Sequence, residues 1–176
     1  MKASVFVGVS LDGFMARVNG ALDFLPEDGE PHGYDEFMAS VDALVMGRKT
    51  FETCLSFPGW PFTKPVFVLS HRALPPVPKG AMVDRVQGEP PEIVQQLAAR
   101  GIGHIYVDGG DTVQQFLRAG LVERIIVTRV PVLIGTGIPL FGRLDRDIRL
   151  THVATRQYKS GLVQSEYEVA GEATRV

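Results

Sequence analysis

The sequence predicts an α/β fold, in which a mixed, mostly parallel sheet carries helices on both faces and ends in a C-terminal antiparallel hairpin. Two observations carry this prediction. Over the first two thirds of the chain, short apolar runs alternate with helical patterns. After residue 121, apolar segments follow one another with no helix between them. Alternating strands and helices are typical of parallel sheets, whereas consecutive strands are typical of antiparallel ones.

Four segments of the first part are predicted to be strands buried on both faces of the sheet. Each is short, nearly continuous in Val, Ile, Leu or Met, and bounded by Gly, Pro or polar residues. They are SVFVGVS (4–10), DALVMG (42–47), PVFVLS (65–70) and HIYVDG (104–109).

Helical patterns separate these strands. Residues 36–41 form the latter part of a first helix, and residues 48–56 form a second after Gly47. The segment PPEIVQQLAARG (90–101) has proline at its start and glycine just past its end. Residues 111–119 form a fourth helix, for which Asp111 or Thr112 is the predicted N-cap.

The last third is predicted to be antiparallel. Its strands are LVERIIVTRVPVLI (121–134), IRLTHVATRQY (148–158) and LVQSEYEVA (162–170), and the turn KSG (159–161) joins the last two as a hairpin. With no repeat or linker, we expect a single domain over residues 1–176. The apolar stretch 124–134 needs more cover than one chain's helices provide, so we expect a homodimer.

Composition excludes several classes of protein. The net charge is −2 and no polybasic segment exists, so we expect neither nucleic-acid nor electrostatic membrane binding. No apolar stretch is long enough to span a bilayer, and the N-terminal apolar run is broken by Asp12. The single cysteine, Cys54, fits a buried packing role and a reducing cytoplasm. The four histidines lack metal-ligand spacing, so no metal site is expected.

Candidate chemistry lies where predicted strands end and helices begin, because helix starts offer unpaired N–H groups and a positive dipole end. Gly47, Arg48, Lys49 and Thr50 form one such joint. Ser70, His71 and Arg72 follow another strand. Each basic group either holds a phosphate or belongs to a solvated turn, and both alternatives stay open for each joint taken alone.

The third joint is the stretch IYVDGGDTVQQFLRAG (105–120), in which Asp108 ends a strand and two glycines precede a helix. Gly109 and Gly110 either let the main chain approach a ligand or form a tight turn that needs positive φ. Neither a G-x-G-x-x-G nor a Walker pattern is present. Three joints in one sheet, two of them basic, favour a ligand with several phosphates, such as a dinucleotide.

Five segments taken together resemble the dihydrofolate reductase-like superfamily. They are VGVSLDGFMA (7–16), YDEFMASVDALVMGRKTFE (34–52), VFVLS (66–70), residues 105–141 and the closing hairpin. The chain is most similar to the reductase domain of the bifunctional riboflavin-biosynthesis deaminase-reductase and its stand-alone relatives, over roughly residues 2–169. The resemblance implies a three-layer dihydrofolate reductase-like fold.

The resemblance also implies NADPH as hydride donor, and it assigns residues to that cofactor. Residues 47–50 match the phosphate-binding helix start, and residues 70–72 match the loop that meets the 2′-phosphate of the adenosine ribose. Asp108, Gly109 and Gly110 match a cofactor-binding turn, in which the family typically has a cis peptide bond between the two glycines. Asp111, Thr112 and Val113 match the residues that cradle the pyrophosphate. Met15 and Ala16 match the segment beside the nicotinamide.

The implied activity is reduction of a small nitrogen heterocycle, most like that of 5-amino-6-(5-phosphoribosylamino)uracil reductase. Dihydrofolate reduction and NADPH binding without turnover are the alternatives. Reduction of a C=N or C=O group needs a proton donor. One candidate donor is Asp12, whose alternative role is to stabilise its own Asp-Gly turn. The other is Asp35 with its neighbour Glu36, whose alternative is to lie on a solvated helix face.

Two further features carry alternatives. Trp60 is expected to anchor its loop, with stacking on substrate as the other possibility. Residues 133–141 are either a glycine turn between strands or part of the rim around the substrate.

Overall fold

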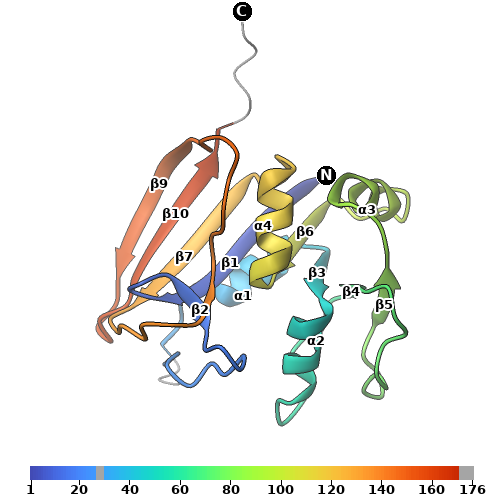
Figure 1. Cartoon of the computed structure of the whole chain (residues 1–176), viewed down its shortest axis with the longest axis horizontal. Coiled ribbons are helices and arrows are strands. Elements are labelled where there is room, and N and C mark those ends of the chain that lie inside the picture. Colours follow the sequence, from blue (N-terminus) through green and yellow to red (C-terminus); the bar gives the residue numbers. More distant parts are fainter. Residues whose placement is uncertain (27–29, 171–176) are drawn as a thin grey trace, which may run out of the picture.

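The computed structural model describes residues 1–26 and 30–170, so the last six residues of the predicted domain lie outside the described part. Its main sheet has eight strands in the order β5-β4-β3-β6-β1-β7-β10-β9 (Figure 1). Their bounds are β1 Lys2–Ser10, β3 Ala43–Gly47, β4 Val66–Leu69, β5 Val83–Val86, β6 His104–Asp108, β7 Arg124–Val130, β9 Leu150–Gln157 and β10 Val163–Val169.

The antiparallel part of the sheet begins later than the predicted boundary at residue 121, because β7 still pairs parallel with β1. The six strands from β5 to β7 are parallel, whereas β10 pairs antiparallel with both β7 and β9. The central strands β3 and β6 are almost wholly buried, as their continuous apolar runs require. The predicted mixed, mostly parallel sheet with a C-terminal hairpin is confirmed.

Four helices cover the two faces of the sheet. They are α1 Tyr34–Ser40, α2 Arg48–Leu55, α3 Pro90–Ala98 and α4 Gly110–Arg118. On one face, α3 and α4 pack their apolar stripes against alternate residues of β1, such as Val5 and Val7. On the opposite face, α1 and α2 pack through Phe37 and Phe51 against residues such as Leu44. The result is three layers (Figure 1).

The helix ends agree with the predictions in part. Pro90 begins α3 as expected, and Glu89 and Glu92 form a reciprocal capping box. The predicted N-cap of α4, Asp111 or Thr112, is wrong: Gly109 is the N-cap and no side chain caps this helix. The helix starts earlier because the main chain turns at Gly109, whose φ is 91°.

Three short strands were not predicted. A second sheet pairs β2 (Phe14–Ala16) with β8 (Ile138–Pro139), segments too short to show an alternating pattern. The edge strand β5 has the sequence VDRV, in which two charged residues hide the apolar signal. The predicted turn at residues 159–161 is confirmed, because the Tyr158 N–H donates to the Leu162 carbonyl across it.

Within residues 1–26 and 30–170, no helix is long and apolar enough to cross a membrane. The same residues contain no group of three or more His, Cys, Asp or Glu side chains that could hold a metal ion.

Candidate active site

The starts of α2 and α4 lie side by side at the carboxyl edge of the sheet. They follow the neighbouring strands β3 and β6, whose residues Met46 and Asp108 are paired. A Cβ atom placed on Gly47 would lie 3.1 Å from the Thr112 hydroxyl, and one placed on Gly109 would collide with the Thr50 hydroxyl. Each helix start therefore packs its glycine against the threonine of the other. Two sets of unpaired N–H groups and two positive dipole ends converge here, which suits a polyanion.

The structure confirms one of the two alternatives for the glycine pair, the turn that needs positive φ. Gly109 has φ 91° and ψ 135°, a conformation that favours glycine, and it also touches Thr50. Gly110 is hemmed in by the second sheet, since an added Cβ would lie 2.9 Å from the Pro139 carbonyl oxygen and 3.5 Å from the Met15 sulfur. The expected cis bond between the glycines is wrong for this structure, because no peptide bond among the described residues is cis and the rotation at Gly109 makes the turn.

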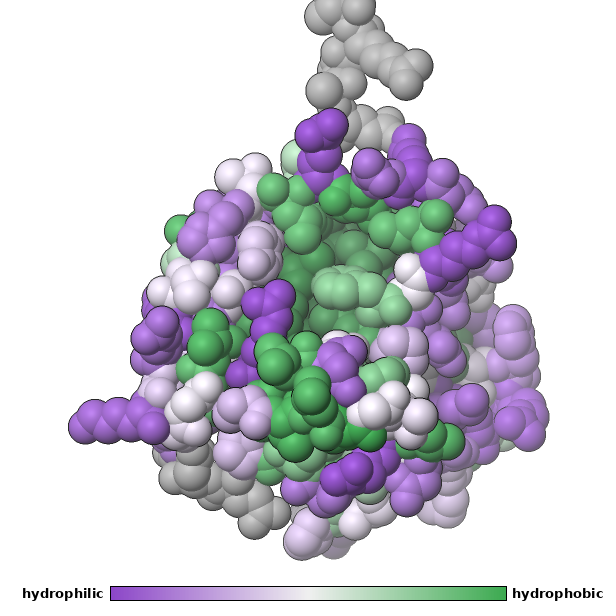
Figure 2. Space-filling view, turned by 60° about the vertical axis from the view of Figure 1, so that its left-hand side comes forward, coloured by the Kyte–Doolittle hydropathy of each residue, from purple (hydrophilic) through white to green (hydrophobic). Residues whose placement is uncertain are grey.

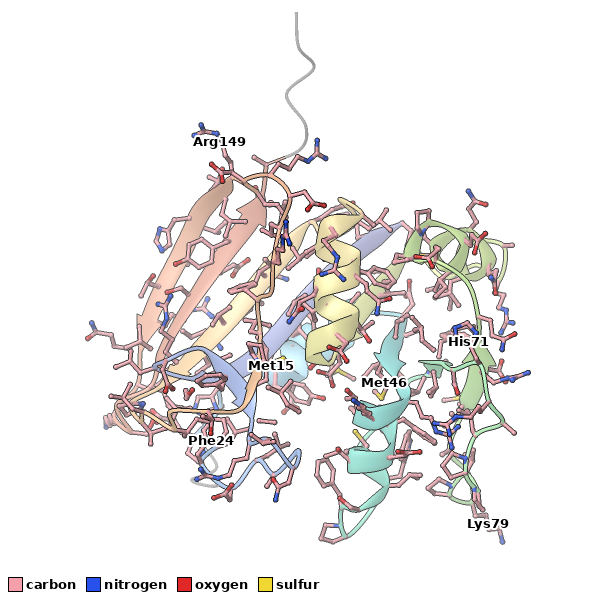
Figure 3. All side chains as sticks on the ribbon, viewed as in Figure 1. Met15, Phe24, Met46, His71, Lys79 and Arg149 are labelled. Atoms are coloured by element: carbon pink, nitrogen blue, oxygen red, sulfur yellow. The ribbon has the colours of Figure 1, made fainter. Side chains whose placement is uncertain are left out.

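The other residues that were assigned to cofactor binding near the start of α4 differ in how deeply they are buried. Thr112 and Val113 are buried, and the Val113 N–H already donates to the Gly109 carbonyl at 2.8 Å, so neither residue presents an exposed side chain to a ligand. Asp111 is exposed. Met15 lies against the start of α4, with its sulfur beside Gly110 (Figure 3). Ala16 is buried in β2, and its carbonyl lies beside Gly137.

Arg48 builds the neighbouring loop rather than presenting a free charge. Its Nε donates to Glu52 at 2.7 Å, and its Nη1 donates to the Ala73 carbonyl at 2.7 Å and to the Ser70 hydroxyl at 3.4 Å. The Ser70 hydroxyl also accepts the Arg72 N–H at 3.2 Å. The structure thus brings residues 70–72 beside the start of α2, through contacts that Arg48 makes.

The cations that remain for a ligand are Lys49, His71 and Arg72. None of the three makes an ion pair with another described residue, and all are exposed. Figure 3 places His71 beside β4 and β5, across α2 from Met15. The site is therefore elongated, from Met15 past the two helix starts to the loop at residues 70–72.

Asp108 is a carboxylic acid in a desolvated position within this site. The residue keeps some exposure to solvent, but burial of its carboxyl raises its pKa to about 6, partly opposed by the Gly109 N–H that donates to Oδ1 at 2.8 Å. Burial, with the nearby Asp108 charge as a smaller cause, raises the pKa values of Tyr34 and Cys54 to about 12. We had assigned Asp108 to cofactor binding, and its titration near neutrality adds a capacity for proton transfer. The sequence feature that could have identified this capacity is the position of Asp108 at the end of a buried strand.

Aromatic side chains gather on the face of the sheet covered by α1. The ring of Phe6 lies 5.5 Å from that of Tyr34 and 5.0 Å from that of Phe37. Tyr34 is 38% exposed, and its phenol is near enough to feel the Asp108 charge. This wall suits a flat ring more than a charged chain.

A cleft of about 310 Å³ lies between the loop at residues 19–22 and the C-terminal half of α2. Thr53 and Ser56 place hydroxyl groups in its wall.

The two predicted acids occupy other environments. Asp12 accepts hydrogen bonds from the Ser10 hydroxyl at 2.6 Å and from the N–H groups of Gly135 at 2.7 Å and Ile134 at 3.3 Å. The Ser10 bond is the main cause that lowers the Asp12 pKa, so this carboxylate stays ionised and ties the end of β1 to residues 134–135. Asp35 and Glu36 are exposed on the first turn of α1.

The other open alternatives are resolved in part. Trp60 lies between Phe51 and Phe62, at ring distances of 5.8 and 5.3 Å, which supports the loop anchor. Residues 133–141 contain a glycine turn at Gly135, φ 77°, and also supply β8, which packs on Gly110. This segment is therefore both a turn and a wall of the site.

Comparisons with known proteins agree with this architecture. The family model of the RibD C-terminal domain matches residues 2–164. The uncharacterized protein YwjB of Bacillus subtilis (strain 168) is 30% identical over 162 residues, which cover 89% of this chain and 92% of YwjB. A Shewanella sp. PV-4 protein described as a riboflavin biosynthesis protein is 37% identical, with a TM-score of 0.88 over 97% of this chain and 99% of its own. Acinetobacter baumannii RibD shares the fold at 15% identity and a TM-score of 0.75, and the match spans 96% of this chain and 58% of RibD.

Proposed function

Since the chain belongs to the RibD C-terminal domain family, we propose that it is a reductase that transfers hydride from NADPH to a small nitrogen heterocycle. The convergence of the α2 and α4 starts, with Thr50 against Gly109 and Thr112 against Gly47, is the observation that carries this proposal. A solved Thermotoga maritima relative carries the name deaminase/5-amino-6-(5-phosphoribosylamino)uracil reductase.

The residues fit a phosphorylated dinucleotide. Main-chain N–H groups at the starts of α2 and α4 would hold the pyrophosphate, and the exposed His71 and Arg72 would meet the 2′-phosphate. Met15, which lies beside Gly110, and the neighbouring Ala16 would border the nicotinamide. NADPH would supply the hydride, and the protein's part is to orient it and to exclude water.

Asp108 is the proton donor that we propose. A carboxyl with a pKa of about 6 holds a proton in a useful fraction of molecules near neutral pH and returns to that state after giving it up. Tyr34, with a pKa of about 12, stays protonated and can donate a hydrogen bond beside it. Asp12 is less suited, because its hydrogen bonds favour the ionised form.

The proposed substrate class is supported by the aromatic residues beside Tyr34 and by the acid Asp108. Phe6 and Tyr34 suit the faces of an aromatic heterocycle, and Asp108 suits its ring nitrogens or exocyclic groups. Among such compounds, the family resemblance favours an aminopyrimidine intermediate of riboflavin synthesis, with a pterin as the second choice.

The test is NADPH consumption with a panel of aminopyrimidines and pterins. Turnover with a member of the panel, with NADPH strongly preferred over NADH, is the expected result. Arg72→Ala should remove most of that preference, while Arg118→Ala, in the last turn of α4, should keep it. Tight NADPH binding without oxidation of any compound would instead favour a protein that binds the nucleotide without turnover.

A further inference from the structure

The surface of the described residues has hollows of different chemical character. A hollow of about 440 Å³ beside the antiparallel strands is lined largely by hydrophobic side chains, such as Ile125 and Val127 (Figure 2). The cleft of about 310 Å³ beside α2 instead has the hydroxyl groups of Thr53 and Ser56 in its wall. Because polar groups fix the orientation and identity of a small ligand, the cleft beside α2 indicates more about the chemistry of what it binds.

This cleft adjoins the place where the proposed function puts the nicotinamide. One wall, residues 19–22, follows shortly after β2, which carries Met15. The opposite wall belongs to α2, where Thr53 lies one helical turn after Thr50, the residue in contact with Gly109. Both walls therefore continue elements that border the proposed site, so the cleft is suited to hold a part of the substrate.

The loop that forms the first wall is held against α2. Arg17 pairs with Asp23 at 2.6 Å, and the Arg17 N–H donates to the Ala21 carbonyl, which closes the loop on itself. A Cβ atom placed on Gly20 would lie 3.4 Å from the Thr53 hydroxyl oxygen. The loop and the helix thus meet at Gly20 and Thr53, at one side of the cleft.

The hydroxyl groups in the cleft accept hydrogen bonds from a ligand but have no proton left to donate. Thr53 Oγ1 donates to the Lys49 carbonyl at 3.1 Å, and Ser56 Oγ donates to the Thr53 carbonyl at 2.6 Å. A hydroxyl has one proton and two acceptor lone pairs. With their protons engaged in the helix, both oxygens present acceptors to the cleft.

Most main-chain donors of the cleft are engaged as well. The N–H groups of Gly20, Ser56 and Phe57 donate to main-chain carbonyls, and the Ala21 N–H donates to the Asn19 side chain at 3.0 Å. No charged residue is among those that line the cleft. The side-chain amide of Asn19 is therefore the main donor that the cleft offers.

The cations closest to the cleft along the chain have other partners or positions. Arg17 pairs with Asp23, and Arg48 pairs with Glu52 at 2.7 Å. Lys49 lies in the first turn of α2, where the proposed function places the pyrophosphate. No counter-charge is thus directed to the cleft by these three side chains.

This chemistry favours an uncharged ligand that brings its own hydrogen-bond donors. A phosphate group carries negative charge and accepts hydrogen bonds. In the cleft it would find neither a counter-charge nor enough donors, so the cost of its desolvation would not be compensated. A polyol, in contrast, has O–H groups that match the oxygens of Thr53 and Ser56.

We propose that the cleft binds an uncharged, hydroxylated substituent of the substrate, such as a ribityl or ribosyl group without phosphate. This inference rests on the proposed function. The O–H groups of the substituent donate to Thr53 and Ser56, while its carbon chain packs on Leu22 and on Phe57, which is 37% exposed. The volume lies at the lower end of small-molecule pockets, roughly 300–1,000 Å³, as suits one substituent rather than a whole ligand.

The test is binding of two compounds to the full chain without cofactor, followed by nuclear magnetic resonance of the isotopically labelled protein. One is an aminopyrimidine with a ribityl substituent, and the other is the same compound phosphorylated at the end of that substituent. We expect the uncharged compound to shift the amide signals of residues 19–22 and 56–57. It should bind about tenfold more tightly than the phosphorylated one.

Thr53→Val removes one acceptor and keeps the shape of the side chain. It should weaken binding of the uncharged compound about three- to tenfold and leave the affinities for the phosphorylated compound and for NADPH unchanged. Thr63→Val is the matched control, because Thr63 is exposed and lies outside the cleft. Should Thr53→Val fail to fold, Ser56→Ala removes the other acceptor and should give the same selective loss.

Equal or tighter binding of the phosphorylated compound would overturn the inference, as would amide signals at the cleft that neither compound moves. Failure of the proposed function has a different signature, which is absence of NADPH binding or of NADPH oxidation. A chain that binds the uncharged compound at residues 19–22 and 56–57 but oxidises no NADPH would keep the assigned ligand of the cleft and contradict the reductase.

Discussion

A carboxyl group in a desolvated position is costly unless a cation pairs with it or it stays neutral. Asp108 has no ion-pair partner among the described residues, and its carboxylate accepts a hydrogen bond from the Gly109 N–H. Its pKa of about 6 follows from that shortage. The same shortage makes it the described acid best suited to deliver a proton.

Asp108→Asn tests this role at the level of one residue. The amide keeps an acceptor for the Gly109 N–H but cannot give up a proton, so we expect kcat to fall by about 10²-fold or more with little change in the Kd for NADPH. Asp12→Asn is the comparison, and it should act mainly on stability. Steady-state kinetics and calorimetry measure both, and full activity in Asp108→Asn would remove Asp108 from the mechanism.

Gly109 is the second residue with a specific requirement. Gly109→Ala adds a Cβ at φ 91° and against Thr50, so we expect a loss of about 3 kcal/mol or more in the free energy of unfolding. Gly101→Ala is the control, since Gly101 has φ 81° with open space around it and should lose about 1–2 kcal/mol. Urea denaturation compares the two. Equal losses would show that contact with Thr50 contributes nothing.

For single residues, the sequence predicted which ones lie close together, but it predicted the role of each one less well. The two glycines, Arg48 and Ser70 stand at strand ends, and strand ends of a parallel sheet share an edge. The positioning role of Arg48 depends on its reach to Ala73, 25 residues away. Likewise, the pKa of Asp108 depends on burial by α1 and α2, which no local pattern reveals.

Among elements, the loop at residues 70–73 depends on α2 for its shape. Arg48 ties the first turn of α2 to Ala73 and Ser70 while pairing with Glu52. These hydrogen bonds fix the shape of the loop at residues 70–73, where we propose that the cofactor binds.

Arg48→Lys tests whether Arg48 acts by holding the shape of the loop or only through its positive charge. Lysine keeps the charge but lacks the planar fork that reaches three partners, so we expect NADPH affinity to fall about tenfold, close to the loss in Arg48→Ala. Should Arg48→Lys bind like the wild type, Arg48 acts through charge and the positioning role is wrong. Calorimetric titration gives the affinities.

Elements with a strong local pattern were predicted and those defined by distant partners were not. The parallel strands and the closing hairpin follow from apolar runs and the turn at residues 159–161. The strands β2 and β8 exist only because residues 14–16 and 138–139 meet. The start of α4 was misplaced because its N-cap is a glycine with no side chain to recognise.

For the whole molecule, Asp108, the proposed proton donor, should lower the free energy of unfolding at neutral pH. The Asp108 pKa rises from the ordinary 3.8 to about 6 on folding, so the folded state binds more protons between these values. The contribution of Asp108 to stability is then greatest below about pH 4 and falls as the pH rises through about 6, by up to about 3 kcal/mol.

Asp108→Asn should flatten this slope and be more stable than the wild type at neutral pH. Asp12 has the opposite sign, because a lowered pKa contributes stability that is lost as the pH falls. Asp12→Asn should therefore leave the decline between pH 4 and 6 in place. Unfolding across this range measures both, and an unchanged slope in Asp108→Asn would contradict a raised pKa.

The central claim is that two helix starts at the carboxyl edge of one sheet, with His71 and Arg72 beyond them, hold a reduced phosphorylated dinucleotide. Calorimetric titration of the wild-type chain with NADPH and with NADH tests it most directly. We expect saturable binding of NADPH with a Kd of tens of micromolar or tighter, at least about tenfold tighter than NADH, which corresponds to about 1.4 kcal/mol. No heat with NADPH, or equal affinity for the two, would contradict it.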